Sequence, residues 1–117
     1  MTEVTAHLRG VNFRPTVAKE VVLALNVGDK LSLEREPSNK FDENAIRVLH
    51  PDEEAEDSRF LGYVAKEVAV VIAPLMDEGT EYSAEVYSFY NTITPVLFIS
   101  PVKETETETV GESQDAA

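Results

Sequence analysis

The sequence predicts a small, mostly-β domain in which six short strands form a barrel accompanied by one clear α-helix. Most apolar residues fall in short segments that alternate with polar ones, the period-2 pattern of half-buried strands. Only residues 65–77 show a clear helical repeat. With 117 residues the chain can bury one core, and without cysteine it has neither disulfides nor thiolate metal sites.

Apolar and polar residues alternate loosely over residues 3–12, and this pattern predicts a first strand that ends at Gly10. The segment Asn12-Phe13-Arg14-Pro15 interrupts it, because a residue before proline is pushed out of the α region. Residues 15–27 favour a short helix, since proline suits a first helical turn and apolar residues recur at a spacing of four. The β-branched pair Val21-Val22 argues instead for a strand.

The clear helix is predicted over residues 65–77, where apolar residues follow the i, i+3, i+4 pattern: Val68, Val71, Ile72, Leu75 and Met76. Pro74 lies inside this pattern and should kink or shorten the helix. Gly79 is a suitable C-terminal stop.

The other strands are expected at residues 30–35, 45–49, 59–63, 80–89 and 94–101. In the last two, alternation separates the faces: Tyr82, Ala84 and Val86 share one, and Leu97 and Ile99 lie opposite Val96 and Phe98. The turn between them is predicted at Asn91-Thr92, and residues 52–57 are predicted to form a solvated hairpin loop.

Acidic residues dominate the charge, which is −12 at pH 7, and they are concentrated in two segments. Residues 52–57 contain five acids, and residues 104–117 contain five acids and no base. Residues 1–103 are therefore interpreted as the domain and residues 104–117 as an acidic, disordered tail. The rest of the chain is nearly neutral, so affinity for a long phosphate backbone should be weak while a small dedicated pocket remains compatible with the charge.

No motif for catalysis is found. His7 and His50 are far apart and lack partners at metal-ligand spacing, and the P-loop, Rossmann, nucleophile-elbow and zinc patterns are missing. The sequence therefore predicts a non-enzymatic protein without metal or cofactor. It contains neither an apolar run of about 20 residues nor a recognisable signal peptide, so we expect a cytoplasmic protein, with association to the nucleoid as an alternative.

The most distinctive stretch is Arg35-Glu-Pro-Ser-Asn-Lys-Phe-Asp-Glu-Asn-Ala-Ile46, a long loop between two predicted strands. It resembles the central signature of the HIRAN domain family. The resemblance continues through Gly10-Val-Asn-Phe13, Leu61-Gly-Tyr63, Lys66 and Ala69, and covers about residues 5–101. It implies an OB-like or SH3-like barrel and binding of the 3′ end of single-stranded DNA.

Carried over residue by residue, the resemblance implies that Phe41 and Asp42 contact the last nucleotide and that Asn39 shapes the same pocket. Asp42, an acceptor only, would bind a free 3′-hydroxyl and repel a phosphate; alternatively it braces the loop. Tyr63 and Lys66 match positions facing nucleotide and phosphate. Phe89 aligns with a stacking aromatic residue. Each aromatic residue could instead belong to the core.

The chain also departs from the family pattern. Asn12 and Phe13 stand where DNA-binding members often carry Arg-Tyr, and Phe41 replaces a commoner Tyr. Arg14 could supply the lost cation, although side chains alternate along an extended chain. With fewer cations and hydroxyls, binding should be weak, on the order of high micromolar at physiological salt.

The expected function is recognition of single-stranded DNA at its 3′-hydroxyl end, in DNA repair or replication-fork processing. A DNA-processing ATPase or nuclease acting in trans is the protein partner that the resemblance suggests. The alternative is an acidic protein-interaction module that keeps the HIRAN fold without DNA binding. Mimicry of DNA fits less well, since the charges gather in one loop and a tail.

Overall fold

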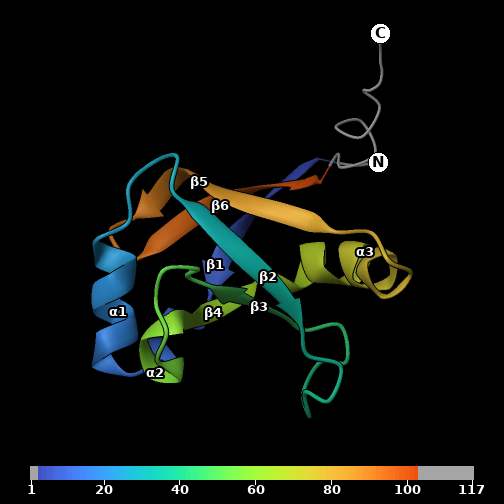
Figure 1. Ribbon diagram of the computed structural model, residues 1–117, viewed down its shortest axis with the longest axis horizontal. Coiled ribbons are helices and arrows are strands. Elements are labelled where there is room, and N and C mark those ends of the chain that lie inside the picture. The colour runs from blue at the N-terminus through green and yellow to red at the C-terminus, as the bar shows by residue number, and fades with distance from the viewer. Residues whose placement is uncertain (1–2, 103–117) are drawn as a thin grey trace, which may run out of the picture.

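A computed structural model describes residues 3–102 and shows six strands. They are β1 (Val4–Arg9), β2 (Lys30–Arg35), β3 (Ile46–Leu49), β4 (Phe60–Val64), β5 (Tyr82–Asn91) and β6 (Thr94–Pro101). All neighbours pair antiparallel, in the order β1-β4-β3-β2-β5-β6, and the sheet closes into a barrel (Figure 1). The predicted six-stranded, mostly-β barrel is confirmed.

The inward faces of the strands form the core. Ala84 and Val86 of β5 are buried together with Leu97 and Ile99 of β6, as their alternation predicted. The remaining core comes mainly from alternate positions of the other strands, among them Ala6, Leu8, Leu31, Ile46, Val48 and Leu61. Alternation therefore directs one face of each strand into the core and leaves the other for surface contacts.

Within residues 3–102, three α-helices and one 3₁₀ turn accompany the barrel. The turn η1 (Val11–Phe13) leads from β1 into α1 (Thr16–Leu23), which confirms the helix predicted within residues 15–27. Helix α1 packs beside α2 (Glu56–Arg59), whereas α3 (Lys66–Asp77) lies toward the other end of the barrel (Figure 1). None of the helices described between residues 3 and 102 has the length and apolar character required to cross a bilayer.

The loop predicted over residues 52–57 does connect the hairpin of β3 and β4, but its last two residues are helical, because α2 begins at Glu56. Its first turn carries Glu56 and Asp57 and its last residue is Arg59, an order that suits the helix dipole. Glu56 also pairs with Arg47 of β3. So short a helix depends on such tertiary contacts and gives no periodic signal.

Helix α3 matches its predicted range, and Pro74 does not shorten it, since it continues to Asp77. The predicted buried face is only partly right. Val71 is 53% exposed, while Ala69 and Ala73 are fully buried beside Ile72. Small side chains on the inner face permit close approach of the helix to the barrel, which residue hydrophobicity alone does not reveal.

The hairpin between β5 and β6 turns one residue later than predicted. Asn91 is the last residue of β5 and pairs with Thr94, so the turn consists of Thr92 and Ile93. The Asn91 side chain accepts a hydrogen bond from the Ile93 backbone N–H at 3.1 Å. Asn91, the residue immediately before the turn, thus stabilises the turn with its side chain.

Gly62 determines how closely β1 approaches β4. In this pair Arg9 lies opposite Tyr63 and Leu8 opposite Val64. A Cβ atom at Gly62 would lie 2.4 Å from the Arg9 carbonyl oxygen, which is closer than real Cβ contacts. Glycine at this position therefore lets the two strands meet, and it places Arg9 next to Tyr63 at the surface.

Candidate functional site

The loop between β2 and β3, residues 36–45, is held in shape by its own side chains; we call it the signature loop. Asn39 Oδ1 accepts hydrogen bonds from the backbone N–H groups of Phe41 (2.8 Å) and Asp42 (3.0 Å). Asp42 Oδ1 accepts one from the Asn44 backbone N–H at 2.9 Å. The loop-bracing role considered for Asp42 is confirmed, and Asn44 takes part through its backbone.

Arg35 fastens the end of this loop to α3. Its guanidinium donates to the carbonyl oxygens of Ala45 at 2.6 Å and Glu43 at 2.9 Å. The same group forms a two-point ion pair with Asp77, at 2.9 and 3.2 Å. The fork geometry of arginine permits these contacts at once. The loop is thereby positioned relative to the last residue of α3.

A second set of contacts joins the signature loop to β4. The Tyr63 hydroxyl donates to Glu36 Oε1 at 2.6 Å, and Asn39 Nδ2 donates to the same oxygen at 2.8 Å. Partial burial would raise the pKa of Glu36, but the two hydrogen bonds and the charge of Arg47 lower it below its ordinary value. Burial and the Glu36 carboxylate raise the pKa of Tyr63. Glu36 is therefore held as a carboxylate that fixes both partners.

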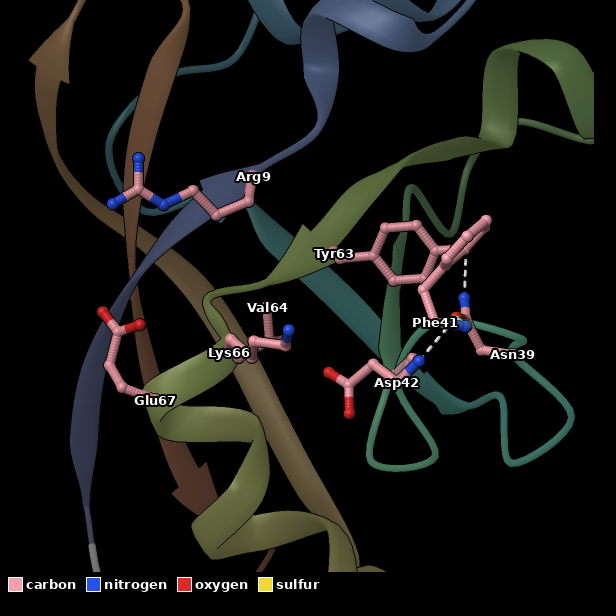
Figure 2. Close-up of a pocket in the computed structure, with 9 residues that line it drawn as sticks. Arg9, Asn39, Phe41, Asp42, Tyr63, Val64, Lys66 and Glu67 are labelled. Atoms are coloured by element: carbon pink, nitrogen blue, oxygen red, sulfur yellow. Dashed lines mark hydrogen bonds between the residues drawn. The ribbon is translucent and has the colours of Figure 1, made fainter.

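These contacts border a cavity of about 360 Å³, which we call the loop–helix pocket. Its walls come from four elements: Arg9 of β1; Asn39, Phe41, Asp42 and Ala45 of the signature loop; Tyr63 and Val64 of β4; and Lys66 and Glu67 of α3. Figure 2 shows the Asp42 carboxylate and Lys66 on facing sides of this space, with the Phe41 and Tyr63 rings beside it. A volume of this size suits one small ligand group.

The two aromatic residues differ in how they are held. Tyr63 is half-buried, and its ring lies edge-on to Phe60 with centroids 5.2 Å apart. Phe41 is 91% exposed, although it belongs to a loop fixed by hydrogen bonds. A rigidly presented, exposed phenylalanine contributes little to the core and is well suited to contact a planar ligand.

The pocket also contains charges of both signs. Lys66 and Arg9 are exposed, and neither forms an ion pair with another residue of the described range 3–102. Two acids line the same pocket, Asp42 on the signature loop and Glu67 on α3 (Figure 2). Helix α3 begins here after Ala65, without a side-chain cap, so its first backbone N–H groups remain available. The site can therefore bind an anion on one side and a hydrogen-bond donor on the other.

Five of the nine residues expected from the sequence meet in this pocket: Asn39, Phe41, Asp42, Tyr63 and Lys66. Asn12 and Phe13 instead line a smaller hollow of about 120 Å³ beside Thr94, which we call the hairpin cavity. Phe13 is 91% exposed there. These two residues lie near the pocket without forming its wall.

Arg14 and Phe89 lie outside both cavities. The Arg14 guanidinium stacks 4.0 Å from the Phe60 ring centroid and donates to the Phe60 carbonyl oxygen at 2.8 Å. Phe89 pairs with Pro95 near the end of β5 and is 38% exposed. Arg14 is therefore engaged in packing in this structure.

Sequence reasoning overlooked Arg9, Glu36 and Glu67. Arg9 is the most informative of them, because it lines both the loop–helix pocket and the hairpin cavity. Its position at the end of a predicted strand was only a weak indication of a binding role. That Arg9 lies beside Tyr63 follows from the pairing of β1 with β4, which the sequence did not predict. Arg9 supplies the pocket with a cation where Asn12 lacks one.

Comparison with known proteins identifies the family and supports the fold. The family model of the HIRAN domain matches residues 2–98, and the chain therefore belongs to the HIRAN domain family. A crystal structure of a protein from Lactobacillus plantarum superposes with a TM-score of 0.72 at 25% identity, covering 86% of this chain and 95% of the other. The crystal structure of the HIRAN domain of human HLTF superposes with a TM-score of 0.63 at 24% identity, covering 85% and 74%, and supports the fold.

Among curated proteins, a Fanconi-associated nuclease 1 homolog of Oryza sativa subsp. japonica is 42% identical over 55 residues. The match covers 47% of this chain and 6% of that protein. The chain thus corresponds to a small part of the length of this relative. The HIRAN domain occurs in a protein named as a nuclease and in HLTF.

Proposed function

We propose that this domain binds single-stranded DNA at its 3′-hydroxyl end in the loop–helix pocket, without catalysing a reaction. The observation that supports this most strongly is the state of Asp42. One carboxylate oxygen is fixed by the Asn44 N–H, and Oδ2 has no hydrogen-bond partner among residues 3–102. An oriented acceptor with a free oxygen stands next to an exposed aromatic ring.

The carboxylate makes the site selective for the kind of DNA end. An ionised aspartate only accepts hydrogen bonds, so it can take the proton of a 3′-hydroxyl. A phosphate in the same position is mostly deprotonated near neutral pH, so it is a poor donor and is repelled by the negative charge. Asp42 therefore contributes discrimination between ends more than overall affinity.

The remaining pocket residues supply contacts that do not depend on sequence. The Phe41 ring stacks on the terminal base, a contact generally worth about 1–3 kcal/mol. Lys66, the α3 N-terminus and Arg9 bind phosphate oxygens of the preceding linkages. The occurrence of the domain in a protein named as a nuclease supports a role in DNA processing, with a nuclease or ATPase as the protein partner.

The proposal is tested by fluorescence anisotropy with two labelled strands that differ only in carrying a 3′-hydroxyl or a 3′-phosphate. We expect at least about tenfold tighter binding of the hydroxyl strand, as for one lost charge-assisted hydrogen bond. In Asp42→Asn the side chain keeps its shape and loses the charge, so the preference should fall to about twofold or less. Asp52→Asn, which removes an exposed acid outside the pocket, is the matched control.

Two results would contradict the proposal. One is equal binding of the two ends by the wild-type protein, which would leave only non-specific contact with phosphates. The other is an unchanged preference in Asp42→Asn. If neither strand binds at low salt, the alternative function, an acidic protein-interaction module, takes precedence. It is favoured by the net charge of −12.

A further inference from the structure

A second concave surface lies between α1 and α2, at the end of the barrel away from α3 (Figure 1). We call this hollow of about 420 Å³ the acidic groove. One wall is the outer face of α1 and the turn after it, where Val17, Val21 and Ala24 follow a helical spacing. The other wall comes from the β3–α2 connection, through His50, Glu53 and Ser58.

Helix α1 carries an apolar stripe wider than its contact with the barrel. Ala18 and Val22 are completely buried in the core and account for its attachment to the barrel. Val17, on the groove side, is 45% exposed. Val21 lies between them and packs partly against the core, so the stripe extends from the core to an exposed edge in the groove. Exposed apolar surface beside a concave site commonly marks an interaction site.

The charges around this apolar strip are all of one sign. Glu20, Asp29 and Glu53 line the groove, and no lysine or arginine does. None of the three takes part in an ion pair with another residue of the range 3–102. Asp29 is oriented by the Asn26 backbone N–H at 2.8 Å. The groove therefore combines exposed methyl groups with uncompensated carboxylates.

We infer that the acidic groove binds a basic segment of a partner protein, in which an apolar side chain is flanked by lysine or arginine. The apolar side chain packs against Val17 and Val21, and the cations pair with Glu20 and Glu53. Charge complementarity of this kind speeds association and excludes wrong partners. The inference is independent of DNA binding and gives a role to Glu53, an acid of the stretch 52–57 that does not line the loop–helix pocket.

Other occupants fit the charges poorly. Nucleic acid and anionic lipid surfaces would be repelled by the same carboxylates. A second copy of the chain in a two-fold arrangement would bring identical acids against each other. The groove is lined by α1 and the loop–helix pocket by α3, and these helices lie toward different ends of the barrel (Figure 1). The proposal therefore allows a DNA end and a protein segment to bind at the same time.

The test uses the full chain and a short fluorescein-labelled peptide built from Lys-Leu-Leu-Lys repeats, with a Glu-Leu-Leu-Glu peptide for comparison. The lysine peptide should bind and shift backbone amide NMR signals of residues 17–29 and 50–58. Glu20→Gln combined with Glu53→Gln should weaken binding about fivefold or more. The matched control, Glu78→Gln with Glu81→Gln, removes two exposed acids that do not line the groove and should change affinity less than about twofold. Val17→Ser tests the apolar contact at constant charge and should also weaken binding.

Several outcomes would overturn the inference. Equal weakening in the groove and control variants would indicate general attraction to an acidic protein. Signal shifts confined to the loop–helix pocket, or binding of the glutamate peptide, would place the contact elsewhere. Sedimentation that shows a dimer dissociated by Val17→Ser would identify a second copy as the occupant. Each of these results leaves the 3′-end test unaffected, because Asp42 is not altered.

Discussion

Replacing Asn39 with alanine should loosen the signature loop more than any other single truncation within it. The side chain accepts from two backbone N–H groups and donates to Glu36 at 2.8 Å and to the Tyr63 hydroxyl at 3.3 Å. A hydrogen bond to a charged group contributes about 1.5–3 kcal/mol and a neutral one about 1 kcal/mol. Because some of these groups are exposed and regain water, we expect a net loss of about 2 kcal/mol in the free energy of unfolding.

Thermal and urea unfolding measure this loss, and a change of about 2 kcal/mol corresponds to a melting temperature lower by roughly 8–16 °C. The matched control is Asn44→Ala, which removes the same carboxamide from the same loop. No side-chain hydrogen bond of Asn44 connects it to another residue in the range 3–102. That variant should stay within about 0.5 kcal/mol of the wild type.

The same pair of variants tests the link from loop structure to binding. Without Asn39 the backbone at Phe41 and Asp42 loses its fixed orientation, so affinity for a 3′-hydroxyl strand should fall about tenfold, while Asn44→Ala should bind normally. If the two variants have the same stability and affinity, the hydrogen-bond network does not shape the pocket. Reduced stability with normal binding would separate the network from the proposed function.

Three further predictions follow from individual contacts. Gly62→Ala places a Cβ 2.4 Å from the Arg9 carbonyl and should destabilise the fold by about 1–3 kcal/mol in urea unfolding; wild-type stability would mean that β1 and β4 separate easily. Arg9→Ala should make the plot of log affinity for single-stranded DNA against log salt shallower by about 0.7, as for one lost phosphate contact. The control Lys19→Ala, on α1, should keep the wild-type slope. A wild-type slope in Arg9→Ala would exclude a phosphate contact of Arg9. Because the pKa of Glu36 is lowered by folding, its contribution is complete above the ordinary value of 4.5 and is lost as the pH falls through the folded pKa. Glu36→Gln should therefore be less stable at pH 7 and less sensitive to acid, and an unchanged acid profile would argue against this role.

Much of the architecture follows from local sequence alone. Alternation located the six strands, and the 3.6-residue repeat located α3, because both patterns record which side of an element faces the core. Polar residues in the signature loop predicted a structured loop, since Asn and Asp form turns with their own backbone. Family resemblance then singled out Asn39, Phe41, Asp42, Tyr63 and Lys66, which the fold brings together in one pocket.

Other features depend on which segments meet in space. Arg9 belongs to the site only because β1 pairs with β4, a contact between residues about fifty positions apart that Gly62 makes possible. The shared Glu36 oxygen, the exposure of Val71 and the acidic groove between α1 and α2 likewise arise from packing. Local sequence encodes the preferences of each element, whereas relative placement depends on distant side chains and on which surfaces remain uncovered after the core has formed.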